Sequence, residues 1–384
     1  MNQTEYSREE LLGRARHAAV QIEQHAGWAE SHGRLHEQAV AALVEAQVPR
    51  LYLPTRLGGL AVDPVTCALI CETLADADAS AAWFVMVYNA ARLMGAKWPE
   101  PMVEALWGED PDTLVAASGH TPLQVRPANG GYIVSGRNSF VSGCHHARYI
   151  LAPASVEGAE SVPHMVAVPA EQCRIIDNWH TLGMRGTGSN DVEVADVMVP
   201  AELLAPAAES ANTFYQDDLY QCPSRVVFAT YVPVALSLAR RALDYLSDLA
   251  GNKLPYASPG RLAQRSLAQV HFGKGLGVYR SARQYFLATL DHYWQRSVAG
   301  ETFSAVERAD LYLAGTHTMQ ACAEAVRHVA DAAGSSVSDR GQPLERILRD
   351  MESLRHHGFA NESRFGSVAQ VHWGVELDYP LLLR

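Results

Sequence analysis

Two features that would direct the chain to nucleic acid or to a membrane are missing. Lys and Arg number 31 against 42 Asp and Glu, a formal net charge of −11, so the positive excess that a phosphate backbone requires is absent. No apolar run approaches the roughly 18–20 residues that cross a bilayer. Residues 1–10 are polar and acidic, unlike a secretory signal peptide. We therefore predict a cytoplasmic protein with neither a nucleic-acid nor a membrane partner.

The cysteines lack the spacing of a redox or zinc motif. The two nearest, Cys67 and Cys71, are four apart and therefore do not form CxxC. A chain of 384 residues can build a core without disulfides, so we expect reduced, mostly buried thiols. The six are Cys67, Cys71, Cys144, Cys173, Cys222 and Cys322.

Signatures of several large enzyme classes are also missing. No GxGxxG follows a strand, and no GxxxxGK[ST], HExxH or GxSxG motif occurs. Nicotinamide Rossmann enzymes, P-loop enzymes, zincins and α/β-hydrolases are therefore disfavoured. Adjacent side chains in His145-His146 and His356-His357 point to different faces, so we predict no metal site.

The first third has helical periodicity. Ser7, Asp63 and Ser80 are expected N-caps, each ahead of apolar residues spaced three or four apart. Ser7 is followed three residues later by Glu10, which completes a capping-box pattern. We predict an N-terminal α-helical domain over residues 1–112.

Short β-rich runs replace the helical pattern in the middle of the chain. Pro, Gly and Asn separate them, as in Asn129-Gly130-Gly131. Because no helix intervenes, an antiparallel sheet or small barrel is favoured over a doubly wound parallel sheet. We predict a β domain over residues 113–220. The runs are 113–117, 132–135, 148–152, 165–168, 174–177 and 192–199.

Long helical patterns return after residue 220. Their lengths are typical of a bundle, so residues 221–384 form a predicted C-terminal α-helical bundle domain. The fold class is therefore α+β, mainly α. The four helical stretches are 226–249, 262–295, 305–332 and 344–357.

Motifs in this order resemble the acyl-CoA dehydrogenase fold. Residues 130–147 resemble GGYxVSGRWxFxSGxxHA, the pattern of the group D flavin-dependent monooxygenases built on that fold, with Asn138 in place of Trp. Residues 182–200 resemble the superfamily's GxRGTGSxDVxVxDVxVP stretch. Residues 48–83 and 332–350 resemble its N-terminal domain and its last bundle helices. The resemblance implies an N-terminal helical domain, a central antiparallel β-barrel or sheet, a C-terminal four-helix bundle and a homotetramer.

The resemblance also implies a flavin site. Phe140, Ser142 and Gly143 belong to the segment that lies against the flavin ring in those enzymes, and strand alternation would place 140 and 142 on one face. Thr187 and Ser189 could present hydroxyls and backbone amides to flavin or phosphate. The alternative is that their loop is merely a tight turn that requires positive φ.

Further flavin contacts are implied in the bundle. Arg261 and Gln269 lie in the segment comparable with an Arg/Gln pair that contacts flavin in the superfamily, often from a neighbouring subunit. Their separation of eight would place them on one helix face. Gly334 and Ser335 are further predicted cofactor-binding residues. The Arg-x-x-Phe-Gly element of the family is absent, which leaves FAD and FMN as alternatives.

The residue expected to act as a base differs from that of the dehydrogenases. Acyl-CoA dehydrogenases carry a catalytic Glu soon after an Arg-Asp pair, but here Arg349-Asp350 is followed by Gly358 at that position, beside His357. The monooxygenase branch has a His near this position, and a pKa near 6.5 lets it accept and return a proton at neutral pH. We predict His357 as the base, with His356 as substitute and substrate contact.

Three further residues are predicted at the site. His120 follows the first strand and is expected near the oxygen-reactive side of the flavin. The Ser142 hydroxyl is expected to stabilise the reduced or oxygenated flavin, and Trp83 to line the substrate side. Each has a simpler alternative: a solvated loop histidine, a turn residue and a core tryptophan.

The sequence therefore predicts a two-component monooxygenase. It would take reduced FAD or FMN from a separate NAD(P)H:flavin reductase and react with O2 through a C4a-hydroperoxyflavin. It would then hydroxylate a small aromatic (phenolic) or amine substrate, in a biosynthetic pathway. Two alternatives stay open: an acyl-CoA or carrier-protein-thioester dehydrogenase with FAD and Glu362 as base, and a non-catalytic binding protein with the flavin fold.

Overall fold

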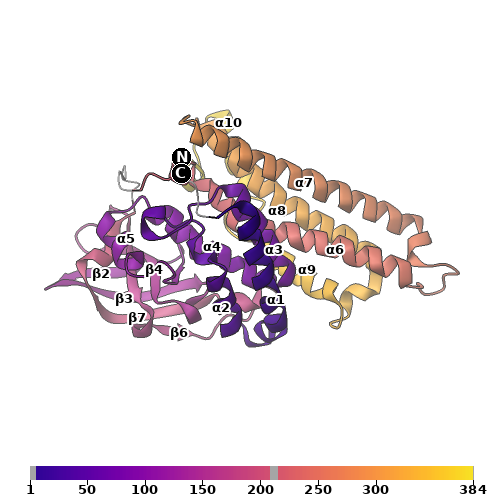
Figure 1. The fold of residues 1–384 in the computed structure, drawn as a ribbon, viewed down its shortest axis with the longest axis horizontal. Coiled ribbons are helices and arrows are strands. Elements are labelled where there is room, and N and C mark those ends of the chain that lie inside the picture. Colours follow the sequence, from indigo (N-terminus) through magenta and orange to yellow (C-terminus); the bar gives the residue numbers. More distant parts are fainter. Residues whose placement is uncertain (1–5, 208–214, 384) are drawn as a thin grey trace.

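The computed structural model describes residues 6–207 and 215–383 and has three regions along its long axis (Figure 1). A twisted sheet lies at one end, a bundle of long helices extends toward the other, and helices from the start of the chain lie between them. The predicted order of helices, sheet and bundle is confirmed.

The N-terminal helices begin largely where the sequence predicts. Ser7 and Glu10 form the capping box, and Asp63 accepts from the Thr66 amide at 2.9 Å. The next cap is Asp78, which accepts from the Ala81 amide at 2.8 Å, and not Ser80, which lies inside the helix. The helices are α1 (Arg8–His32), α2 (Glu37–Glu45), α3 (Pro64–Ala77), α4 (Ala79–Gly95) and α5 (Glu100–Trp107).

In the residues that the structure describes, the β region is one mixed sheet of eight strands, in the order β6-β7-β3-β2-β4-β5-β8, with β1 paired to β4. The pairs β1–β4 and β2–β4 are parallel and the others antiparallel, so the antiparallel expectation holds for most of the sheet. Strands β2 and β8 were not predicted. The strands are β1 (Val115–Ala117), β2 (Leu123–Ala128), β3 (Gly131–Val141), β4 (Tyr149–Val156), β5 (His164–Pro169), β6 (Arg174–Ile176), β7 (Asn190–Val199) and β8 (Leu204–Pro206).

The predicted bundle is present, with two changes at its ends. A 3₁₀ turn, Ser224–Thr230, precedes the first long helix, and a further helix, α10 (Arg364–Trp373), follows the fourth. The four long helices are α6 (Val232–Asn252), α7 (Ser266–Val298), α8 (Ala305–Ala333) and α9 (Pro343–Leu354).

The interior is divided differently from the secondary structure. One buried cluster joins the N-terminal helices to the bundle and includes Leu43, Phe84, Phe286 and Met351. A second lies between the sheet and α5, around Trp107. The N-terminal helices and the bundle therefore share a core, and the domain limits at 112 and 220 stay predictions.

Two expectations about apolar residues can be compared with the fold. Ser224–Asn252 is long and apolar enough to span a membrane by composition, contrary to the sequence expectation, but 89% of its most apolar window is buried in the protein. Its position in the core accounts for that composition. All six cysteines are free, and all but Cys173 are buried, as predicted.

Candidate active site

Buried polar side chains form a continuous chain of hydrogen bonds where α4 meets the end of β3. Trp83 Nε1–H donates to Ser142 Oγ at 3.2 Å, Ser142 Oγ lies 2.7 Å from Ser189 Oγ, and Ser189 Oγ lies 2.8 Å from Thr187 Oγ1. The Thr187 hydroxyl donates to the Met184 carbonyl oxygen at 2.8 Å. The structure thus brings together three residues predicted to contact flavin and one predicted to contact substrate.

The direction of this chain follows from its protons, because each hydroxyl has only one to donate. Thr187 uses its proton on Met184, so Ser189 donates to Thr187 and Ser142 donates to Ser189. The Ser142 oxygen accepts from Trp83 and keeps a second lone pair. A ligand N–H placed beside Ser142 would therefore find an acceptor.

The backbone at the end of β3 departs from strand geometry. Phe140 has a φ of 59°, and the register against β7 shifts between Asn138 and Val141, which marks a β-bulge. The strand ends at Val141, the Phe140 ring is 55% exposed and Ser142 is buried. The expectation that 140 and 142 share one strand face is therefore wrong, because the bulge interrupts the alternation.

Gly143 holds this turn against α4 and the neighbouring loop. Its φ is 75°, and a Cβ would lie 3.2 Å from side-chain atoms of Phe84 and Val87. Its amide donates to the Thr187 carbonyl at 3.0 Å. Close packing and backbone conformation therefore both require glycine at position 143. Its amide joins the two segments that carry the hydroxyls of Ser142, Ser189 and Thr187, called the hydroxyl chain below.

An exposed aromatic surface lies two residues along the chain from Ser142. The Phe140 ring is 5.1 Å from the His120 ring and 6.3 Å from the Trp179 ring, both edge-on. His120 Nδ1 lies 2.9 Å from the Thr121 hydroxyl. The structure therefore places His120 beside Phe140, and its role in oxygen chemistry stays a prediction.

Helix α9 positions the loop that carries Thr187 and Ser189. The Met184 amide donates to Asp350 Oδ1 at 2.6 Å, and the Gly183 amide donates to Ser353 Oγ at 2.9 Å. A Cβ on Gly183 would lie 2.2 Å from the Arg349 carbonyl oxygen, so only glycine fits there. The hydroxyl chain is thus held from a helix more than 160 residues away in sequence.

Asp350 is the buried centre of this attachment. Burial raises the pKa of its carboxyl to about 6, the cation of Arg346 opposes that shift, and the acids Asp78 and Glu30 add to it. Arg346 lies 3.5 Å from both Asp350 and Glu30 and forms a close ion pair with Asp78. One arginine therefore stabilises three carboxylates from α9, α1 and the start of α4.

His357 lies among aromatic rings next to the hydroxyl chain. Its ring centroid is 5.1 Å from those of Trp83 and Phe359 and 5.7 Å from that of Tyr231. The Phe359 amide donates to His357 Nδ1 at 3.4 Å, which favours the tautomer with its proton on Nε2. Burial lowers the pKa of His357 to about 4, so the ring is neutral at physiological pH.

This neutral histidine, partly buried among aromatic rings, gives a pH prediction. Between about pH 6.5 and 4 the unfolded chain protonates His357 and the folded protein does not, so stability falls as pH falls through that window. A shift of this size corresponds to about 3 kcal/mol. We expect the melting temperature of the wild type to drop more steeply over this range than that of His357→Gln. Parallel curves would contradict the conclusion that His357 is neutral in the folded protein.

His356 and Glu362 are placed less favourably. The His356 side chain is 64% exposed and its Nε2 lies 4.0 Å from Glu352, so it points away from the Trp83 rings and is not positioned as substrate contact or substitute base. Glu362 lies on an exposed turn before α10. Of these three residues, His357 is the one that lies against the rings of Trp83 and Tyr231.

The predicted bundle contacts lie elsewhere. Arg261 precedes α7 and donates to the Gly251 carbonyl, while Gln269 lies inside α7 and donates to the Ala263 carbonyl. The two are not on one helix face, because a 3₁₀ turn and a break separate them. Gly334 and Ser335 follow α8, near the same end of the bundle, the end farthest from the sheet (Figure 1). Within one chain these four do not join Ser142.

Sequence reasoning missed several residues of this region. Tyr231 and Phe359 face His357, Trp179 faces Phe140, and Asp350 accepts from the Met184 amide. Phe359 could have been found from its position two residues after His357. Tyr231 gave no signal, since an aromatic residue in an apolar run is typical of a core.

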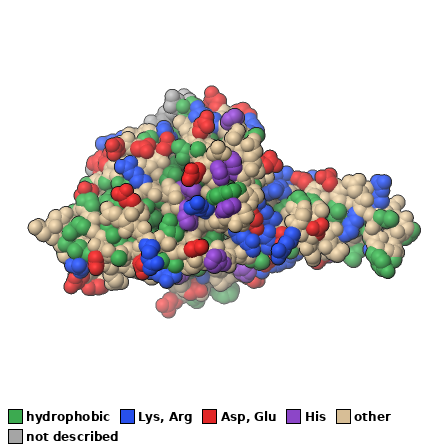
Figure 2. All heavy atoms as spheres, turned by 90° about the horizontal axis from the view of Figure 1, so that it is seen from below, with side chains coloured by type: hydrophobic (Ala, Val, Ile, Leu, Met, Phe, Trp, Pro, Cys, Tyr) green, Lys and Arg blue, Asp and Glu red, His purple; other side chains and the backbone are tan. Residues whose placement is uncertain are grey.

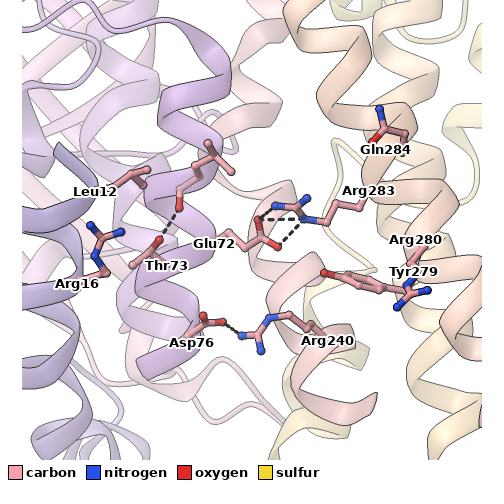
Figure 3. A pocket seen from close by; sticks show the side chains of 11 residues that line it. Leu12, Arg16, Glu72, Thr73, Asp76, Arg240, Tyr279, Arg280, Arg283 and Gln284 are labelled. Atoms are coloured by element: carbon pink, nitrogen blue, oxygen red, sulfur yellow. Dashed lines mark hydrogen bonds and ion pairs between the residues drawn. The ribbon is translucent and has the colours of Figure 1, made fainter. Parts of the chain in front are cut away.

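A cavity of about 700 Å³ lies apart from these residues, between α1, α3, α6 and α7 (Figure 3). Glu72 and Arg283 form a bidentate ion pair across it, and Arg240 pairs with Asp76. None of the predicted site residues lines it. On the face shown in Figure 2, acidic and basic side chains are interspersed and histidines gather near the middle.

Comparison with known families matches both helical parts of the chain. The family model for the acyl-CoA dehydrogenase N-terminal domain matches residues 8–97, and that for the acyl-CoA dehydrogenase C-terminal domain matches residues 229–362.

Similar proteins extend over almost the whole chain. Indole-3-acetate monooxygenase of Pseudomonas putida is 29% identical over 334 residues, 86% of this chain and 85% of its own. The oxygenase component of the FADH2-dependent resorcinol hydroxylase of Rhizobium sp. strain MTP-10005 is 27% identical over 391 residues, covering 95% and 94%. Among solved structures, XiaF from Streptomyces sp. in complex with FADH2 and glycerol superposes with a TM-score of 0.91 at 20% identity, covering 97% of both chains.

Proposed function

Because the chain belongs to the acyl-CoA dehydrogenase family, we propose that it acts as the oxygenase component of a two-component flavin monooxygenase on a small aromatic substrate. The observation that carries this proposal is the partly buried, neutral His357 beside Trp83, next to Gly358, where the resemblance to the acyl-CoA dehydrogenases would place a glutamate. The relatives support it, since one is named a monooxygenase and another an FADH2-dependent hydroxylase oxygenase component.

The residues present fit a reduced flavin. The Ser142 oxygen is an acceptor with a free lone pair, and the ring of a reduced flavin carries an N–H at N5. Phe140 offers exposed aromatic surface two residues from Ser142, and the partly buried Trp179 ring lies edge-on to it. Bound there, the flavin would supply the activation of O2. Ser142, Thr187, Ser189 and Gly143 would hold its ring, with either FAD or FMN as the carrier.

The chain's own residues would position the substrate and move its proton. Trp83, Tyr231 and Phe359 form an apolar wall suited to an aromatic ring. His357 would take a proton from a phenol or amine at Nδ1, the nitrogen that is unprotonated in this tautomer, and return it. Because the imidazole starts neutral, it does not first have to lose a proton. Burial of the Trp83 and Tyr231 side chains would keep water from this side of the reacting group.

Two partners complete the proposal. A separate NAD(P)H:flavin reductase would supply reduced flavin, in keeping with the relative named an oxygenase component. A homotetramer is proposed because α7 exposes Leu267, Val270 and Tyr285. The segment between α6 and α7 and the first turn of α7, which carry Arg261 and Gln269, lie at the end of the bundle away from the sheet, so these two residues could serve a neighbouring subunit (Figure 1). The free thiols accord with a cytoplasmic location.

Oxygen labelling tests the proposed reaction. We expect the chain, given reduced FAD or FMN and ¹⁸O2 with a panel of phenols and aryl amines, to insert one ¹⁸O atom into product, measured by mass spectrometry. Ser142→Ala should weaken reduced-flavin binding roughly 10-fold, the loss of one hydrogen bond in a buried site, while Ser142→Thr should bind as the wild type does. Anaerobic bleaching of oxidised FAD by an acyl-CoA, without label incorporation, would instead support the dehydrogenase alternative.

A further inference from the structure

Arg225 is a buried cation without an acid partner in the described part of the chain. It lies in the 3₁₀ turn before α6 and is 7% exposed. One guanidinium nitrogen donates to the Leu381 carbonyl oxygen, whereas Nε has no hydrogen-bond partner. The guanidinium otherwise lies over aromatic rings, 5.6 Å from that of Tyr312 and 5.8 Å from that of Phe359.

A second buried arginine shows what a purely structural arrangement looks like. Arg92 is fully buried and its Nε also lacks a partner, but its terminal nitrogens donate to three carbonyl oxygens, those of Tyr88, Pro111 and Thr113. Arg225 has one such carbonyl. Because a buried cation is costly unless it is paired or hydrogen-bonded, Arg225 retains an unmet capacity for an anion.

Two phenol hydroxyls near Arg225 are also poorly satisfied. Tyr231 and Tyr312 are completely buried, and neither hydroxyl makes a hydrogen bond of normal geometry in the described structure, although the Tyr379 phenol lies close enough to that of Tyr312 to help raise its pKa. Both rings pack on Phe228, with centroid distances of 5.6 and 4.9 Å. Burial raises the pKa of both phenols, so each is an O–H donor. One buried region therefore contains the Arg225 guanidinium and two phenols whose O–H groups make no regular hydrogen bond.

This region adjoins the base. The Tyr231 ring is 5.7 Å from the His357 ring. The Phe359 ring contacts both neighbours: its centroid is 5.1 Å from that of the His357 ring and 5.8 Å from the Arg225 guanidinium carbon. A ligand whose aromatic ring lay against Trp83 and His357 could extend a short side chain past Phe359. The atoms at the end of that side chain would meet the three unsatisfied donors.

We propose that Arg225, Tyr231 and Tyr312 bind the carboxylate of an aromatic acid substrate that carries this group on a short side chain. The inference rests on the proposed function for the position of the ring. The carboxylate would replace the Leu381 carbonyl, from the C-terminal turn Pro380–Leu383, as partner of the guanidinium. A carboxylate can accept two hydrogen bonds from one guanidinium and still accept from the phenols.

Isothermal titration with matched acids and amides tests this site. The full chain, without and with reduced FMN under anaerobic conditions, is titrated with 4-hydroxyphenylacetate, indole-3-acetate and the amide of each. We expect at least one acid to bind roughly 10-fold more tightly than its amide, as a charged hydrogen-bonded pair gives. Arg225→Met should remove that preference. Tyr231→Phe should weaken binding of the acid roughly 5-fold and leave the affinity for the amide unchanged.

A structural role predicts a different pattern. Tyr88→Phe is the control, since Tyr88 is also buried with an unpartnered hydroxyl but lies outside this region. Equal affinity for acid and amide, binding of neither, or an unchanged preference in Arg225→Met would overturn the proposal. The ¹⁸O2 experiment separates the two claims: an acid preference without oxygen insertion refutes the reaction alone, and oxygen insertion without an acid preference refutes this site alone.

Discussion

Replacing His357 by alanine is expected to lower hydroxylation at least 100-fold while oxygen consumption continues and hydrogen peroxide accumulates. General acid–base groups contribute about 10²–10⁴-fold, and without a base the substrate cannot lose its proton in step with oxygen transfer. Product by chromatography and peroxide by a coupled assay give the ratio directly. Reduced-flavin affinity should change little, because the contacts of His357 are with the rings of Trp83, Tyr231 and Phe359. The hydroxyls of Ser142, Ser189 and Thr187 are held by other partners.

The neighbouring histidine is the matched control. His356 is exposed and directed toward Glu352, so His356→Ala should keep the product-to-peroxide ratio of the wild type. Reversed behaviour of the two variants would assign the base to His356. Full coupling in both would remove histidine from the mechanism.

The second large effect is expected from Asp350. Asp350→Ala deprives the Met184 amide of its acceptor and Arg346 of one of three carboxylates, all in a buried site. Removing one partner of a buried charged cluster costs about 3–5 kcal/mol. We expect a lower melting temperature together with weaker reduced-flavin binding, since the 183–189 loop that carries Thr187 and Ser189 loses its attachment.

A conservative variant separates the two consequences. Asp350→Asn keeps an oxygen that can accept from Met184, and burial already raises the pKa of Asp350 to about 6, so a neutral group is tolerated near that pH. Flavin affinity in Asp350→Asn should stay within about threefold of the wild type. Equal loss of flavin affinity in the Ala and Asn variants would show that charge, and not the hydrogen bond to the loop, is what matters.

Sequence reasoning succeeded where a residue's surroundings are local. The Ser142 and Thr187–Ser189 segments each lie in a contiguous motif, and the caps at Ser7 and Asp63 depend on residues within three positions. Asp78 was missed because it and Ser80 are both good caps two residues apart. The β-bulge at Phe140 was missed because positive φ at a phenylalanine has no signature in composition.

It failed where position depends on distant packing. Arg261 and Gln269 were placed on one helix because spacing alone does not reveal the break before Ser266. His356 and His357 are equivalent in sequence, and only the packing of Trp83 and Tyr231 directs one inward. The contact between Asp350 and Met184 joins segments 166 residues apart, which no local pattern encodes.

The contacts of Arg346 constrain how the protein can move. This side chain binds Asp78, Glu30 and the Ala26 carbonyl on the N-terminal helices, and Asp350, its neighbour on α9, holds the loop of the sheet region. Hinge opening between the three regions would break these buried charged contacts together. Ligand exchange is therefore confined to local shifts of loops, side chains or the C-terminal turn, and solvent viscosity should affect its rate less than it affects enzymes whose domains swing apart.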